Sequence, residues 1–275
     1  MNYIINHTTT YTYLEPVSLC HNVLRLVPRN TETQICKEVK VNIYPKPDSL
    51  REYEDFFGNK VIYFSIEKEH AQLKVNVRSE IGKWSRKQEE ADSAEDISQY
   101  IFATPMTEGD KEMEAYARVS FLPGRPLLEA ARDLMHRIYT DFDFTPGFTT
   151  ISTPLSVVMR ERKGVCQDFA HLAIACVRSV GLPARYVSGY IETLSPPGVE
   201  KLVGVDASHA WFSIYIPQMG WVDLDPTNDV QPGDQHITIG WGRDYADIAP
   251  MKGIIISSGS HELAVSVDVR RSGMV

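Results

Sequence analysis

One cysteine in this chain stands where a nucleophilic thiol is expected. Cys166 lies in the segment 164–171, GVCQDFAH, and an apolar helical pattern follows it. Gly164 would let the chain turn tightly just before that helix. A helix start offers unpaired backbone N–H groups and the positive end of the helix dipole, and both favour the thiolate over the thiol. The same groups can bind a developing oxyanion, and the backbone amide of Cys166 is the natural first donor.

His209 and Asp225 have the residue types and the order along the chain to activate such a thiol. His209 opens an apolar strand pattern over 210–216, and Asp225 closes a second strand pattern over 221–224. A hairpin that joins the two strands would bring the carboxylate beside the imidazole. The carboxylate would then orient the ring through one nitrogen and leave the other nitrogen for the thiol. The three residues therefore predict a Cys-His-Asp acyl-transfer enzyme.

Asp223 is the competing carboxylate, because it stands two residues before Asp225 and would share its face of a regular strand. Pro226 indicates that the strand ends at Asp225, which places that residue at the rim and favours it. The alternative for both acids is a solvated turn residue, and the alternative for His209 is a structural histidine. For the nucleophile the alternative is a buried inert thiol, a description that fits Cys176 in the middle of the same helical pattern.

A metal site is a further alternative for this region. Cys166, Asp168 and His171 could be combined with His209 as ligands. Their spacing matches no Cys/His zinc pattern and only one cysteine is near, so we expect neither a metal nor another cofactor. His171 is then a helix residue that packs against the sheet. Asp168 falls in the first helical turn, where a carboxylate suits the dipole.

The elements that must position these residues divide the chain near residue 85. Residues 3–80 carry five or six short strand patterns with turn signals between them, which predicts a β-sandwich-like module. Residues 85–95 are polar, lack apolar periodicity and are typical of a linker. The remainder runs helices first and strands afterwards, as in an α+β domain whose helices pack on an antiparallel sheet. We therefore predict an N-terminal β-rich domain over 1–85 and an α+β catalytic domain over 86–275.

The helix that begins at Cys166 is the clearest of the later elements. Its apolar positions recur at helical spacing, and it is expected to end at 181–183, GLP. Two more helices are expected behind Pro126 and Pro154, and strands are expected over 184–192, 210–216, 221–224, 253–257 and 263–269.

Composition narrows the partners and the compartment. The chain has 28 lysines and arginines against 36 aspartates and glutamates, a net charge of −8, which argues against nucleic acid or an anionic membrane as the main partner. Its first residues do not resemble a signal peptide, and no apolar run approaches the roughly 18 residues that span a bilayer. The four cysteines of a chain with a full-sized core are expected to be reduced. Together these features predict a cytoplasmic protein.

Several of these segments resemble the bacterial transglutaminase-like superfamily. The resemblance lies in 164–171, in 181–190 (GLPARYVSGY), in the HAW at 209–211 and in the DPT at 225–227; segments within 7–59 resemble the β-domain that accompanies this family, and 242–247 (GRDYAD) also matches. It implies a papain-like core with Cys166 as nucleophile, His209 as base and acid, and Asp225 as the orienting acid. It also implies a second oxyanion donor upstream of the cysteine, within 141–153, where no residue stands out.

This superfamily includes cross-linking enzymes, peptidases and amidases, and inactive relatives. We expect a transglutaminase-like cysteine protease or amidase that acts on a peptide or protein substrate, because water is the default acyl acceptor. The alternatives are a transglutaminase that joins glutamine and lysine side chains, and a non-catalytic peptide-binding module. For the N-terminal module we favour a scaffold over a role in substrate recognition. The particular substrate and the oligomeric state do not follow from these patterns.

Overall fold

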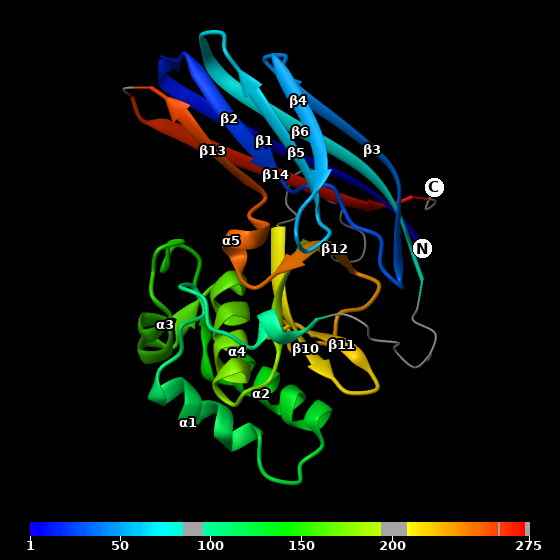
Figure 1. Ribbon diagram of the computed structural model, residues 1–275, viewed down its shortest axis with the longest axis vertical. Helices are drawn as coiled ribbons and strands as arrows, with labels where there is room; N and C mark the ends of the chain where they lie inside the picture. The colour runs from blue at the N-terminus through cyan, green and yellow to red at the C-terminus, as the bar shows by residue number, and fades with distance from the viewer. Residues whose placement is uncertain (85–95, 194–207, 258, 273–275) are drawn as a thin grey trace, which may run out of the picture.

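The computed structural model describes residues 1–84, 96–193, 208–257 and 259–272, and it shows a β-sandwich beside a mixed α+β unit (Figure 1). The sandwich strands are β1 (Asn2–Val17), β2 (Leu19–Leu24), β3 (Gln34–Tyr44), β4 (Ser49–Glu54), β5 (Lys60–Ile66), β6 (His70–Lys83), β13 (Met251–Ile256) and β14 (His261–Arg271). The helices of the second unit are η1 (Ser98–Tyr100), α1 (Lys111–Ser120), α2 (Leu127–Asp141), α3 (Leu155–Glu161), α4 (Cys166–Ser179) and α5 (Tyr245–Ile248). Its strands are β7 (Asp143–Phe144), β8 (Lys163–Gly164), β9 (Ala184–Ile191), β10 (Ser208–Ile216), β11 (Gly220–Leu224) and β12 (His236–Gly242).

Two four-stranded sheets form the sandwich, with strand orders β14-β1-β6-β3 and β13-β2-β5-β4. Alternate residues of the strands face inward, as the period of a strand requires: Tyr3 and Ile5 of β1 are buried, and so are Val75 and Val77 of β6. These side chains join Phe64 of β5 in one core between the sheets. The predicted β-sandwich-like module is therefore confirmed.

The last two strands, β13 and β14, belong to the sandwich and not to the catalytic domain in which the predicted division placed them. β14 pairs antiparallel with β1, and β13 pairs with β2, so both complete the N-terminal sandwich although the division assigned them to the catalytic domain 86–275. A strand's sequence specifies which of its faces is buried but not which strand it joins, and this is why the pairing was missed. The predicted linker 85–95, with the boundary at its start, lies outside the described residues.

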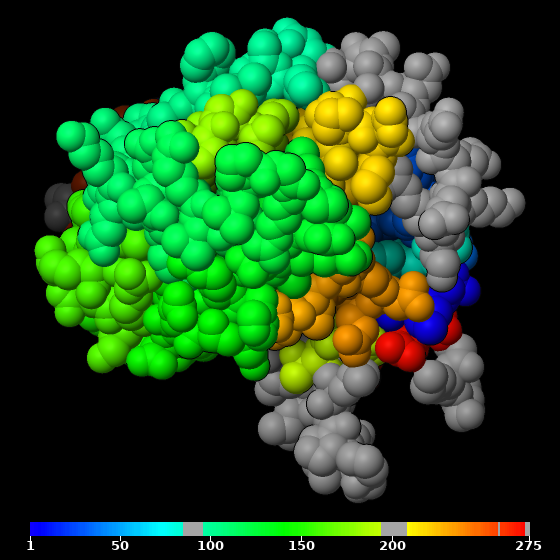
Figure 2. Space-filling model, turned by 90° about the horizontal axis from the view of Figure 1, so that it is seen from below, coloured from blue at the N-terminus to red at the C-terminus, as the bar shows by residue number. Residues whose placement is uncertain are grey.

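The second unit is a four-stranded antiparallel sheet, in the order β11-β10-β9-β12, with helices packed against it, which confirms the predicted α+β class. Buried side chains of α1 to α4 and of β9 to β11 share one core. Figure 2 shows this unit from below, where the helical segments in green form much of the visible face and the β10–β11 hairpin in yellow lies beside them. Among the helices of the described residues, none has the length and apolar character that a bilayer span requires.

The helix α4 lies at the centre of this unit and is buried on nearly all sides. Its apolar positions Ala170, Ala173, Ile174 and Val177 are all fully buried, as their spacing predicts. The helix ends before Gly181, whose φ of +80° lies in the left-handed region that glycine tolerates best. The start of α4 is consequently held at a fixed place against the sheet.

Candidate active site

Cys166 is the first residue of α4, and its side chain is partly exposed. The residue before it, Val165, is extended, and the Asp168 carboxylate turns back to accept its N–H at 2.9 Å. Thr149 Oγ1 donates to the same carboxylate at 2.6 Å. The helix start is thus capped from within the chain, while the first-turn N–H groups around the cysteine have no intrahelical acceptor.

Gly164 has a different role from the tight turn expected of it. It lies in β8, which pairs with β7, and its φ is outside the left-handed region. A Cβ at this position would approach Cβ of Asp168 to 2.9 Å and a ring carbon of Phe169 to 3.2 Å. Glycine is required because the first turn of α4 packs directly on this strand.

His209 is the second residue of β10, and only 7% of its surface is exposed. Its Nε2 atom lies 2.7 Å from Oδ2 of Asp225. A carboxylate only accepts hydrogen bonds, so Nε2 carries the proton and Nδ1 remains for a second partner. The Cys166 side chain also lies close enough to this imidazole to influence its pKa. The structure therefore brings the three predicted residues together.

Asp225 is fully buried, and every partner of its carboxylate is a donor. Oδ2 accepts from His209, from Asn228 Nδ2 at 2.7 Å and from His236 Nε2 at 3.0 Å, while Oδ1 accepts the N–H of Thr227 at 2.9 Å. Burial alone would raise the pKa of Asp225, but the hydrogen bonds from the two histidines and the nearby charge of His209 hold that pKa well below its usual range. The carboxylate is therefore charged around neutral pH.

The imidazole of His209 responds to the same contacts. Burial disfavours the charged ring, but the hydrogen bonds with Asp225 and Cys166 outweigh it and raise the pKa of His209 to about 9. An imidazolium that persists at neutral pH stabilises an adjacent thiolate. The arrangement can therefore hold Cys166 and His209 as an ion pair.

Asp223, the competing carboxylate, is engaged by another residue. It accepts a hydrogen bond from the hydroxyl of Ser213 on the neighbouring strand. The β10–β11 hairpin pairs Phe212 with Leu224 at the end of its ladder, and Asp225 follows directly. The predicted hairpin is thus present, and the residue that it delivers to His209 is Asp225.

His236 is the residue of this site that sequence analysis missed. It opens β12, a strand that the patterns did not predict, and it is buried. No motif or spacing distinguished it from the other histidines of the chain. Its contact with Asp225 depends on β12 joining the outer side of β9, a pairing that no local pattern encodes.

The two histidines and the carboxylate also form a group whose potential metal-ligating atoms lie within 4.8 Å of one another. Both Nε2 atoms, however, point at the same oxygen and donate to it, at 2.7 and 3.0 Å. A tetrahedral zinc ion with bonds of 2.0–2.2 Å separates its ligand atoms by roughly 3.3 Å, so this group would have to open to hold one. The donor geometry fits a hydrogen-bonded cluster better than a metal centre.

The segment 141–153, expected to supply a second oxyanion donor, runs beside the start of α4. Its strand β7 pairs in parallel with β8, and Thr145 donates its N–H to the Gly164 carbonyl at 2.8 Å. The hydroxyl of Thr149 is engaged by Asp168. The segment therefore runs beside β8, the strand that leads into α4.

Two residues set aside as structural occupy the places expected of them. His171 packs its ring on Tyr186 of β9 with 4.9 Å between ring centres, and burial lowers its pKa to about 3. Cys176 is fully buried in α4, and burial raises the pKa of its thiol to about 12. All four cysteines are free in the structure.

Comparisons with known proteins match both parts of the chain. The family model of the bacterial transglutaminase-like N-terminal region covers residues 3–82, and that of the transglutaminase-like superfamily covers residues 114–226. An uncharacterized protein of Mycobacterium tuberculosis is 38% identical over 97% of this chain and 92% of its own length. A protein-glutamine gamma-glutamyltransferase of Pseudomonas aeruginosa is 39% identical over 26% of this chain and 11% of its own length.

A solved structure also resembles the whole chain. A proposed cysteine protease from Cytophaga hutchinsonii superimposes with a TM-score of 0.78 at 23% identity, and the match covers 100% of this chain and 92% of that chain. That similarity shows a shared fold. Together with the family models, it identifies this chain as a member of the transglutaminase-like superfamily with the accompanying N-terminal β-domain.

Proposed function

We propose that this protein is a cysteine-dependent acyl-transfer enzyme that hydrolyses peptide or amide bonds through a thioester. The observation that supports this most directly is a partly exposed thiol at a helix start, close to an imidazole that a buried carboxylate orients. Cys166 is then the nucleophile, His209 the acid and base, and Asp225 the orienting residue. This constellation is required for nucleophilic catalysis and has no evident use in a purely structural domain.

The reaction follows from the protons that these residues hold. The thiolate attacks the carbonyl carbon, and the electron pair of the C=O bond moves to oxygen, to which the Cys166 N–H can donate a hydrogen bond. As the intermediate collapses, the C–N bond breaks and the His209 imidazolium protonates the leaving nitrogen, which yields a thioester and a neutral imidazole. Water, deprotonated by His209, then attacks the thioester. The acid departs, and thiolate and imidazolium are restored.

Substitution of the nucleophile tests the mechanism. Cys166→Ala is expected to abolish turnover of a peptide library and to leave the fold intact, because the partly exposed side chain contributes little packing. Cys176→Ala, at the buried cysteine of the same helix, is the matched control for the loss of a thiol and should retain turnover. A thioester adduct should be visible by mass in the wild-type protein on the peptide that contains Cys166. Turnover that persists in Cys166→Ala would refute the mechanism.

A transglutaminase reaction is the second candidate, and the partial match to a protein-glutamine gamma-glutamyltransferase favours it. In that reaction a lysine amine, instead of water, attacks the thioester. Incubation of the enzyme with a glutamine peptide and a fluorescent primary amine separates the two candidates. Label on the peptide would contradict simple hydrolysis, whereas plain release of the acid would contradict cross-linking.

A non-catalytic peptide-binding module is tested without any substrate. Alkylation of Cys166 by iodoacetamide at pH 6 should exceed that of an ordinary exposed cysteine, because an adjacent imidazolium favours the reactive thiolate. Cys36 is a useful internal reference, since burial raises the pKa of its thiol to about 11. Equal rates at Cys166 and in a small model thiol at pH 6 would support the binding module.

The proposed thiolate chemistry also favours a reducing compartment, and we propose the cytoplasm. Four free cysteines, one of them partly exposed at the candidate site, would be liable to oxidation elsewhere. Fractionation of the source cells with a detection tag tests this, and recovery outside the cytoplasmic fraction would overturn it.

A further inference from the structure

His236 is a second histidine that donates to the carboxylate of the candidate triad. Its Nε2 donates to Oδ2 of Asp225 at 3.0 Å, the same oxygen that accepts from His209 at 2.7 Å. The ring of His236 lies edge-on to Trp211, with 5.3 Å between ring centres and an interplanar angle of 87°. Trp211 in turn lies 6.0 Å from the ring of His209. His236 is thus held close to His209 by contacts with both Asp225 and Trp211.

A buried carboxylate needs such a partner. With no surface exposed to water, Asp225 can be charged and fixed in one orientation only if its lone pairs are occupied by protein donors. If His236 were removed, Oδ2 would keep only His209 and Asn228 as donors, so one of the three contacts that fix its orientation would be lost. The carboxylate could then turn away from His209 or take up a proton.

His236 is itself held by the N-terminal sandwich. Lys83, the last residue of β6, is buried and donates its Nζ to the carbonyl of Gly233 at 2.8 Å and to the carbonyl of His236. Burial lowers the pKa of Lys83 to about 8, against the opposing influence of Asp234 and Asp223. The turn that leads into β12 is therefore tied to the sandwich immediately beside the triad.

The rest of β12 is also hydrogen-bonded to residues of the sandwich. Gln34 donates to the carbonyl of Thr238 at 2.8 Å and accepts its N–H at 2.9 Å. The backbone N–H of Arg29 donates to the Ile239 carbonyl at 3.1 Å. Asn59 donates to the Trp241 carbonyl at 2.8 Å and accepts its N–H at 3.0 Å.

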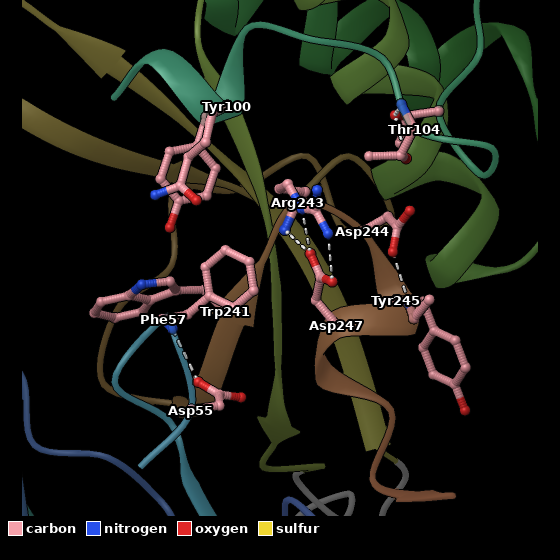
Figure 3. Close-up of polar contacts among 12 residues, drawn as sticks. Asp55, Phe57, Tyr100, Thr104, Trp241, Arg243, Asp244, Tyr245 and Asp247 are labelled. Atoms are coloured by element: carbon pink, nitrogen blue, oxygen red, sulfur yellow. Dashed lines mark hydrogen bonds and ion pairs between the residues drawn. The ribbon is translucent and has the colours of Figure 1, made fainter. Parts of the chain in front are cut away.

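Figure 3 shows the far end of this strand, with Trp241 and Arg243 close to Phe57 and Asp55 of the loop that precedes β5. Arg243 is ion-paired with Asp247, which fixes the chain just after β12. Side chains and backbone groups of the sandwich thus form hydrogen bonds with β12 from His236 to Trp241.

We propose that His236 is a positioning residue for the triad, and that the N-terminal β-domain sets the geometry of the triad by holding the strand that carries it. This inference rests on the proposed function, because it assigns His236 a role in the activation of Cys166. The N-terminal domain then supports catalysis by holding β12 in place. None of its described residues is hydrogen-bonded to the three candidate catalytic side chains.

The expected consequence is a change in the acidity of the thiol–imidazole pair. The charged and titratable groups that face His209 are Asp225, Cys166 and His236, the last with 5.9 Å between ring centres. His236 is faced by Asp225 and His209, with the Lys83 ammonium at its carbonyl. Without His236, a displaced Asp225 supports the imidazolium less, the neutral thiol–imidazole pair gains over the ion pair, and less thiolate exists at low pH.

The experiment is the pH profile of Cys166 alkylation by iodoacetamide, followed by peptide mass spectrometry. His236→Phe is expected to move the acid limb up by about one pH unit, which is about a tenfold lower rate at pH 6. His236→Gln, which keeps an N–H donor, should recover most of the wild-type rate. With a turned-over peptide, kcat should fall in His236→Phe while KM stays close to the wild-type value.

Two further variants separate positioning from general damage. His70→Phe removes a buried histidine of β6 that bonds the Lys68 carbonyl within the sandwich, and should leave the profile unchanged. Gln34→Ala releases β12 without touching the triad, and it should shift the profile in the same direction as His236→Phe. It therefore tests the inference even if His236→Phe fails to fold. Melting temperatures by circular dichroism accompany each profile.

The outcomes distinguish this inference from the proposed function. A folded His236→Phe with the wild-type profile, an unshifted Gln34→Ala, or an equal shift in His70→Phe would overturn the positioning role and leave the enzyme proposal standing. Wild-type Cys166 that reacts no faster at pH 6 than an ordinary thiol would overturn both.

Discussion

At the residue scale, one buried carboxylate determines the charge state of its neighbours. Asp225 receives four hydrogen bonds and exposes no surface, so its negative charge acts on His209 with little screening by water. This explains how a buried imidazole, which would ordinarily lose its proton, has a pKa raised to about 9. The same logic explains the contrast with His171, whose equally buried ring has no such partner and whose pKa falls to about 3.

Asp225→Asn is the corresponding prediction. It preserves shape but removes the charge, so the imidazolium is less stable and turnover should fall about 10²- to 10⁴-fold, measured as kcat/KM on an identified substrate. Asp223→Asn, which removes the carboxylate bonded to Ser213, is the matched control and should retain most activity. Equal losses in the two variants would contradict the assignment of Asp225.

The contact between Asp225 and His209 should also make the free energy of unfolding depend on pH. The lowered pKa of Asp225 contributes stability above its unfolded value of about 4, and that contribution is lost as pH falls. The raised pKa of His209 contributes stability below about 6.5, and that contribution is lost as pH rises through about 9. The stability advantage of the wild type over Asp225→Asn in urea unfolding should therefore be largest between about pH 4 and 6.5. An advantage that is flat from pH 4 to 9 would contradict this coupling.

At the element scale, the site is made where a helix start meets three strands. β9 is the strand between β10 and β12, and it brings Gly189 opposite both His209 and Thr238. A side chain at Gly189 would collide with the Ile237 carbonyl and with the Trp211 ring. This glycine therefore permits the strand that carries His209 and the strand that carries His236 to approach each other.

Gly189→Ala should consequently destabilise the protein by about 1–3 kcal/mol, the usual range for overpacking a dense interior. It should also slow Cys166 alkylation at pH 6, because β10 and β12 are pushed apart beside the triad. Gly233→Ala is the control, since a Cβ there meets no atom within 4 Å and its φ is outside the left-handed region. Chemical unfolding measures the free energies, and equal values for the two variants would be inconsistent with the close approach.

At the scale of the whole molecule, the sandwich and the α+β unit share a seam built of stacked cations and aromatic rings. The Arg29 guanidinium lies 3.4 Å from the ring centre of Trp241, and Arg185 lies 3.8 Å from Trp241 and 4.3 Å from Trp221. A cavity of about 680 Å³ lies along this seam and is lined by His236, not by Cys166 or His209. The seam therefore extends to His236, behind Asp225, and Cys166 and His209 do not line its cavity.

Deletion of the C-terminal strands tests the unity of the molecule. Without residues 250–275, β1 and β2 would each lose a neighbouring strand, so the sandwich should lose its cooperative thermal transition. Through β12, Cys166 should lose its enhanced alkylation at pH 6. Ile254→Thr, on the exposed face of β13, is the control and should keep both properties. A truncated protein with the wild-type melting temperature would contradict this account.

Local patterns were enough to predict the three candidate residues, their order and the elements that carry them. The helix α4 and the β10–β11 hairpin are short-range features, and apolar spacing, Gly181 and Pro226 encode their limits locally. The three-dimensional fold was needed to find that β13 and β14 join the sandwich, that β12 joins β9, and that His236 meets Asp225. A pattern of period two states which face of a strand is buried, but the choice of partner depends on packing between residues far apart in the chain.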